Sequence, residues 1–167
     1  MLSLRHILPL WKTFKQILNL WFHMTVKLLD FSKLKKTLDE KKIEFADFIV
    51  KNFGVAYVVA VTREKCSGCE RQRPLFEKLS DKMKGKYGSR VGFFRVHARY
   101  SPENKEETLQ CLDTFRTVAF PTYILCVRNH QGKNRETYRA LEPPMSEIER
   151  NIKTAVELAI WFESKKE

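Results

Sequence analysis

Residues 55–69 read Val-Ala-Tyr-Val-Val-Ala-Val-Thr-Arg-Glu-Lys-Cys-Ser-Gly-Cys. The apolar first half of this stretch has the composition of a buried β-strand, and a helical pattern follows its last residue. Two cysteines three residues apart in the first turn of a helix have side chains about 5 to 6 Å apart, a separation that a disulfide bridges with little strain. The stretch therefore predicts a strand, a helix, and between them a pair, Cys66 and Cys69, that can open and close reversibly.

The start of the predicted helix favours Cys66 as the nucleophile of the pair. A helix N-terminus carries a partial positive charge, which stabilises a thiolate relative to a thiol. Basic residues around the pair outnumber acidic ones, and a positive field acts in the same direction. These residues are Arg63, Lys65, Arg71 and Arg73 against Glu64 and Glu70. Cys69 is then the resolving thiol, whereas the direction of electron flow stays open because solvated charges have small effects.

A zinc site is the main alternative use of a CxxC motif, and it needs two further ligands. The other cysteines and the histidines form neither a second CxxC nor an HxxxH pair. They are Cys111, Cys126, His6, His23, His97 and His130. We therefore expect no metal and no other cofactor. Cys111 and Cys126 are expected to be separate buried thiols, although a second disulfide between them stays open.

Two motifs beyond the cysteine pair make the chain resemble the thioredoxin family. Pro74 stands five residues after Cys69, where family members have a proline that kinks the helix. Phe120-Pro121-Thr122 precedes an apolar run, 123–127, and resembles the family's cis-proline loop. The resemblance covers roughly residues 52–162. It implies an α/β fold of three layers, in which helices cover both faces of a central mixed sheet.

The resemblance also implies an activity, thiol–disulfide exchange on protein disulfides with electron transport to or from a reductase or an oxidase. By the same resemblance Cys66 and Cys69 are catalytic, and the cis-proline loop binds an extended substrate peptide through Phe120, Pro121 and Thr122. The residues expected to tune the site are Lys65, Ser67, Gly68 and Pro74.

The chain departs from the family at the positions that support acid–base chemistry. Lys65 stands where thioredoxins have a tryptophan, and Ala60 stands where they bury an aspartate. Arg95 is the nearest match to a lysine that accompanies that aspartate in the family. A second function therefore stays open, a thioredoxin-fold module with little turnover that binds peptides or tethers substrates, docked on a membrane assembly.

Hydrophobic periodicity and turn residues predict one domain, residues 30–167. The expected helices are 31–50, the CxxC helix to about residue 84, 102–115, and 146–163 with Ser146 as its N-cap. The expected strands are 55–62, 91–98, 122–127 and 135–140.

Residues 1–29 are predicted to be a basic, amphipathic helical extension. They contain Arg5, Lys12, Lys15 and Lys27 but no acidic residue. Their longest uncharged run, 16–26, falls short of the roughly 20 residues that a membrane-spanning helix needs. Docking on an anionic membrane surface, binding of a partner and packing against the domain all stay open, as does a true start at Met24.

A net charge of +11 raises the question of nucleic acid. No recognised binding motif accompanies the basic residues, so we expect no nucleic-acid partner. The expected location is cytoplasmic, with peripheral association with a membrane as the alternative.

Overall fold

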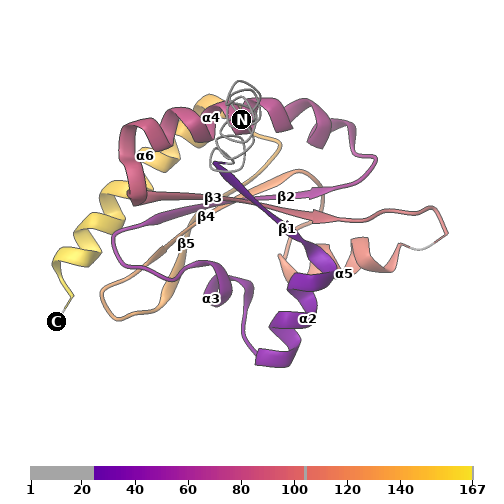
Figure 1. Ribbon diagram of the computed structural model, residues 1–167, viewed down its shortest axis with the longest axis horizontal. Helices are drawn as coiled ribbons and strands as arrows, with labels where there is room; N and C mark the ends of the chain where they lie inside the picture. Colours follow the sequence, from indigo (N-terminus) through magenta and orange to yellow (C-terminus); the bar gives the residue numbers. More distant parts are fainter. Residues whose placement is uncertain (1–24, 104, 167) are drawn as a thin grey trace, which may run out of the picture.

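The structure, a computed structural model, describes residues 25–103 and 105–166 (Figure 1). Five strands form one sheet in the order β1-β3-β2-β4-β5. Their bounds are β1 Val26–Asp30, β2 Ala56–Arg63, β3 Val91–Ala98, β4 Thr122–Arg128 and β5 Asn134–Leu141. β1, β3 and β2 run parallel, whereas β4 and β5 are antiparallel to their neighbours. The sheet is therefore mixed, as the sequence predicted.

Helices cover both faces of this sheet (Figure 1). α4 (Ser67–Tyr87) and α6 (Met145–Ser164) pack on one face, and a short 3-10 turn, Gly88–Arg90, leads from α4 into β3. α2 (Phe31–Lys41), α3 (Phe45–Ile49) and α5 (Glu106–Thr114) lie on the other face. The fold is thus the three-layer α/β arrangement.

The alternation of side chains along β2 explains how both faces are filled. Ala56, Val58 and Ala60 belong to the core beneath α4 and α6. Tyr57, Val59 and Val61 belong to the core beneath α2, α3 and α5. A central strand covered on both sides is apolar at every position, which is why residues 55–61 form a continuous hydrophobic run.

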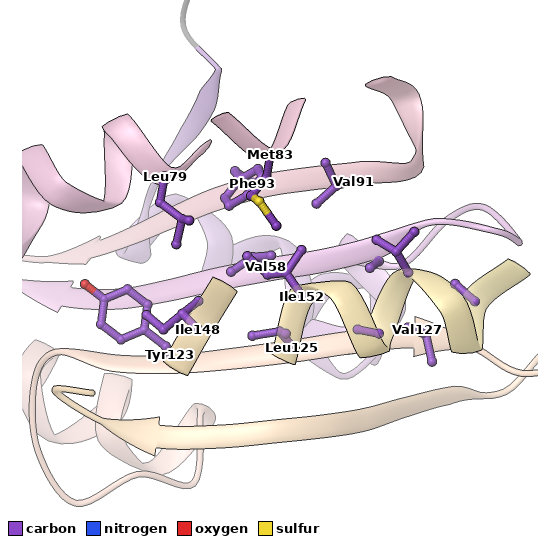
Figure 2. Close-up of a cluster of buried hydrophobic side chains, with 14 of the residues drawn as sticks. Val58, Leu79, Met83, Val91, Phe93, Tyr123, Leu125, Val127, Ile148 and Ile152 are labelled. Atoms are coloured by element: carbon purple, nitrogen blue, oxygen red, sulfur yellow. The ribbon is translucent and has the colours of Figure 1, made fainter. Parts of the chain in front are cut away.

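The core beneath α4 and α6 fixes the position of the helix that begins with the cysteine pair. Leu79 and Met83 of α4 and Ile148 and Ile152 of α6 point toward the sheet, where they meet side chains such as Phe93 (Figure 2). The Phe76 ring lies 5.6 Å from the Phe93 ring and 5.3 Å from the Tyr123 ring, between centroids. Burial holds the pKa of Tyr123 well above its usual range.

The segment predicted as one helix, 31–50, forms two. α2 begins at the N-cap Asp30, whose carboxylate accepts a hydrogen bond from the Lys33 N–H, and it ends at Lys42. Lys42 adopts a left-handed conformation with φ 51°, and the Ile43 N–H donates to the Leu38 carbonyl at 3.1 Å. These two features form a helix C-terminal motif that turns the chain before α3.

The C-terminal end of the predicted extension belongs to the sheet. Residues 26–29 were assigned to the extension, but they lie in β1, which pairs with β3 from Val26 opposite Phe93 to Asp30 opposite His97. A five-residue edge strand in which Val26 is the only buried residue gives little periodicity of its own, and its partner lies more than 60 residues away. The helical extension predicted before it lies mostly in residues 1–24, outside the described residues.

Two helix starts also differ from prediction. α5 begins at Glu106, four residues after the predicted start, and α6 begins at Met145 with Pro144 as its N-cap. Ser146 is therefore inside the helix and does not cap it. Among residues 25–103 and 105–166, no helix has the length and hydrophobicity needed to cross a bilayer.

Candidate functional site

Cys66 and Cys69 form a disulfide at the first turn of α4, with 5.2 Å between their Cα atoms. Cys66 is the N-cap of the helix, and its Sγ accepts a hydrogen bond from the Cys69 N–H at 3.2 Å. Only 8% of Cys66 and 6% of Cys69 is exposed. The sulfur of Cys66 thus occupies the place where an N-cap oxygen normally sits, and an anion is stabilised there by the N–H groups and the helix dipole.

The loop between β2 and α4 delivers the pair to this position. The Glu64 N–H donates to the Ala98 carbonyl at 2.9 Å, which fixes the end of β2 against β3. Lys65 then adopts φ 51°, a left-handed conformation that turns the chain into the helix. Its side chain is exposed and lines a hollow together with Cys69.

A loop at the start of β4 lies against Cys66. The Phe120–Pro121 peptide bond is cis, and Cys66 Sγ lies 3.7 Å from the Phe120 carbonyl oxygen. The Thr122 side chain is buried, and its hydroxyl donates to the Ala119 carbonyl at 2.8 Å. The Phe120 carbonyl is therefore brought to the cysteine pair and Pro121 follows it through the cis bond, whereas the Thr122 side chain stabilises the loop itself.

The other predicted tuning residues have distinct surroundings. A Cβ atom on Gly68 would lie 2.9 Å from Oε1 of Glu142, so this position has no room for a side chain unless the carboxylate moves. Glu142 also forms an ion pair with Arg71 at 2.6 Å. Ser67 and Pro74 are exposed on α4, and neither lines a hollow at the site.

Each cysteine lines a different hollow. Cys66 lies in one of about 270 Å³, with Arg63, Thr108, Leu112, Val118, Ala119 and Phe120. Cys69 lies in a larger one of about 490 Å³, with Leu28, Thr62, Arg63, Glu64, Lys65, Glu70, Arg73, Arg95 and His97. We call the first the Cys66 hollow and the second the Cys69 hollow. The disulfide therefore has an apolar approach on one side and a charged approach on the other.

Ala60 occupies the position that holds a buried aspartate in the family that the sequence resembles. It is paired in the sheet with Arg95 of β3 and Tyr123 of β4, and it is buried. Arg95 forms an ion pair with Glu77 at 3.3 Å. The group beside Ala60 is therefore the Arg95 guanidinium, whose carboxylate partner, Glu77, lies on α4. β2 itself supplies no carboxylate.

Cys111 and Cys126 are free, buried thiols in the core on the opposite face of the sheet. Burial raises the pKa of each to about 12. Among the residues that the structure describes, no cluster of histidine, cysteine, aspartate and glutamate has the arrangement of a metal site.

These thiols lead to a simple prediction for alkylation. At pH 8 roughly one in 10,000 molecules of a thiol with a pKa near 12 is ionised, so Cys111 and Cys126 should not react. We expect iodoacetamide to add two groups to the reduced, native protein and four to the reduced, denatured protein, as measured by intact mass. Modification of Cys111 in the native protein would contradict the burial of that side chain.

The structure adds Tyr100 and Val118 to the site, which the sequence did not indicate, and it shows the contacts of Arg63, which the sequence indicated only as one of the basic residues near the pair. The Arg63 guanidinium stacks 4.3 Å above the Tyr100 ring and lies 5.8 Å from the Phe120 ring, so it lines the approach to Cys66. Val118 is 87% exposed beside that approach. No local sequence signal identifies Tyr100 or Val118, because their place at the site depends on contacts between segments more than 30 residues apart.

Comparison with known proteins finds similar folds among solved structures. No model of a protein family matches the sequence, and no curated protein is significantly similar to it. Among solved structures, a thioredoxin from Nicotiana alata is 22% identical, over 78% of this chain and 91% of its own, with a TM-score of 0.50. A thioredoxin from Trichomonas vaginalis is 12% identical, over 78% of this chain and 96% of its own, with a TM-score of 0.51. The chain therefore has the thioredoxin-like fold that its sequence motifs predicted.

Proposed function

We propose that this protein is a thiol–disulfide oxidoreductase that acts on protein disulfides through Cys66 and Cys69. One observation carries the proposal. Cys66 Sγ is the N-cap acceptor of α4, 3.2 Å from the Cys69 N–H, and it is bonded to a second sulfur in the same turn. The same atom is thus stabilised as an anion and lies within reach of a resolving thiol.

The reaction has two exchange steps. In the reduced protein the Cys66 thiolate attacks one sulfur of a substrate disulfide, so a mixed disulfide forms and the other substrate sulfur leaves as a thiolate. The Cys69 thiolate then attacks Cys66 Sγ, the mixed disulfide breaks, and the second substrate sulfur leaves. Two electrons have passed to the substrate, and the Cys66–Cys69 bond has formed. The reverse sequence oxidises a substrate dithiol.

Cys69 must lose its proton before the second step. Glu64 and Glu70 line the Cys69 hollow and are the carboxylates available to accept the proton directly or through water. They take the place of the buried acid that Ala60 does not provide.

The Cys66 hollow supports binding of a peptide next to its disulfide. Leu112, Val118 and Phe120 give it an apolar lining, and the Phe120 carbonyl lies beside the sulfur. An extended peptide can pair with backbone at this loop and place one apolar side chain in the hollow, which selects for shape more than for sequence.

The buried Ala60 beside Arg95 favours a second candidate function. Without the acid of the usual relay, resolution by Cys69 would be slow, and the fold would act as a module that holds a peptide without rapid turnover. The two candidates differ in the reactivity of Cys66, which can be measured directly.

The deciding experiment is an alkylation series from pH 4 to pH 10 on the reduced protein, with the rate at Cys66 followed by peptide mass. The oxidoreductase requires an apparent thiol pKa below the unperturbed value of about 8.5. The Cys69→Ser variant serves as the matched control, because it leaves Cys66 as the one thiol in the pair. A slow Cys66 with an unshifted pKa in both proteins would favour the binding module. A midpoint potential from glutathione buffers then sets the direction of electron flow.

A further inference from the structure

The Cys69 hollow lies between the first turns of α4 and the carboxyl ends of β3 and β2. Its volume of about 490 Å³ falls in the range of small-molecule sites. It is separate from the Cys66 hollow, where the proposed substrate peptide binds, and it has a different chemical character. Of the residues that line it, the peptide exchange described above uses Cys69 and the two carboxylates.

Positive charge dominates this hollow. Four of its side chains, Arg63, Lys65, Arg73 and Arg95, are basic, and two are carboxylates. His97 adds no charge at pH 7, because burial and the nearby Arg95 lower the pKa of its imidazole. Its Nδ1 atom lies 3.1 Å from the Thr62 hydroxyl. The lining therefore has an excess of two positive charges.

Arg95 is the most constrained of these cations. Its side chain is 20% exposed, and its single ion pair uses Nη1, which lies 3.3 Å from the Glu77 carboxylate. The Nε atoms of Arg95 and Arg63 are buried and have no hydrogen-bond partner among the described residues. A buried donor of this kind is costly unless it binds an acceptor. Both guanidinium groups that line the hollow thus have an Nε donor that no described residue satisfies.

Guanidinium groups recognise carboxylate and phosphate oxygens through paired N–H donors. Basic side chains on a convex surface would diverge and each be solvated separately. Here they converge on one concavity from β2, α4 and β3, so one ligand can contact several of them. A small molecule with two or more negative charges would match the excess charge of the lining.

We propose that the Cys69 hollow is a binding site for a small oxyanion-bearing molecule, a polycarboxylate or a phosphate compound, and that its occupancy is linked to the redox state of the cysteine pair. The binding itself is independent of the proposed function. The linkage rests on the proposed function, because it requires a cysteine pair that cycles between disulfide and thiolate.

The sign of the linkage follows from electrostatics. An anion beside Cys69 repels a thiolate at the pair but not a disulfide. It therefore binds the oxidised protein more tightly than the reduced protein, and by reciprocity it makes the midpoint potential more negative. A tenfold difference in affinity corresponds to a shift of about 30 mV.

The test uses the oxidised full chain, with pyrophosphate and citrate as probes and with chloride added to keep the ionic strength constant. Binding is followed by ¹H–¹⁵N NMR. We expect saturable shifts at amides of residues 62–73 and 95–97. A higher affinity for pyrophosphate assigns phosphate compounds as the ligand class, and a higher affinity for citrate assigns polycarboxylates. Shifts spread over the surface without saturation would overturn the site.

Three variants separate a built site from general attraction to a basic protein. Arg95→Gln and Arg73→Gln should each weaken binding about tenfold, since a charged hydrogen bond contributes about 1.5 kcal/mol or more. Arg73 is exposed, so its variant keeps the test valid if Arg95→Gln fails to fold. Arg71→Gln is the matched control, because it removes the same charge from α4 but Arg71 pairs with Glu142 and does not line the hollow. Equal weakening in all three variants would contradict the proposal.

The midpoint potential is then measured with and without the tighter probe. A more negative potential in its presence supports the linkage. Saturable binding with an unchanged potential overturns the linkage and leaves the binding site intact. If the pair proves inactive in disulfide exchange, the NMR result still decides whether the site exists.

Discussion

We expect Cys66→Ser to reduce the rate of insulin-disulfide reduction to the uncatalysed background. The serine hydroxyl at this position has the same N-cap geometry, but it is not ionised and does not attack sulfur. The helix should remain, because serine is a good N-cap residue. The assay follows insulin precipitation with dithiothreitol as the electron source, and circular dichroism checks the fold. Activity well above background in this variant would show that Cys66 is not the attacking residue.

The companion variant, Cys69→Ser, should behave differently. Cys66 can still attack, but no thiol is present to break the mixed disulfide, so the protein accumulates as a covalent adduct with its substrate. The adduct should be visible on a non-reducing gel and should disappear after treatment with dithiothreitol. An adduct that forms on Cys66→Ser and is absent from Cys69→Ser would reverse the assigned roles of the two cysteines.

The second large effect is expected from Phe76→Ala, which should lower the free energy of unfolding by about 3 to 5 kcal/mol. Phe76 is 1% exposed, and its ring packs against Phe93 and Tyr123 beneath α4. Its removal leaves a cavity at the point where the helix that begins with the cysteine pair meets the sheet. Urea unfolding of the oxidised protein, followed by circular dichroism, measures the change.

The neighbouring residue provides the matched control for this variant. Leu75 lies on the same helix but is 52% exposed, so Leu75→Ala should change the stability by less than about 1 kcal/mol. Similar losses in the two variants would mean that α4 is not held to the sheet by the face that carries Phe76.

The central part of the fold could be predicted because its signals are local. The apolar run of β2 and the strand β3, predicted as 91–98, reflect burial on both faces of the sheet. The CxxC motif, the later proline and the Phe-Pro-Thr loop mark turns and junctions that a chain can specify within a few residues. These elements bring Cys66, Cys69 and the Phe120 carbonyl together.

The remaining features depend on distant contacts. β1 is a strand because β3 offers it an edge, and α2 ends where Lys42 adopts a left-handed conformation that the residue type does not indicate. Val118 is exposed, and the Thr122 side chain faces inward, because of the path of the loop between α5 and β4. The Cys69 hollow joins side chains from several separate segments, so its charge could not be assigned from the residues around the cysteine pair alone.

The isolation of Cys111 and Cys126 on the far side of the sheet has a consequence for the electrochemistry of the protein. Since both are enclosed in the core, the molecule exposes a single sulfur couple to its surroundings. A redox titration should therefore follow the Nernst equation with a two-electron slope, with no intermediate species and no covalent dimers at the end point. The protein would then interconvert between only two covalent forms, the Cys66–Cys69 disulfide and the corresponding dithiol.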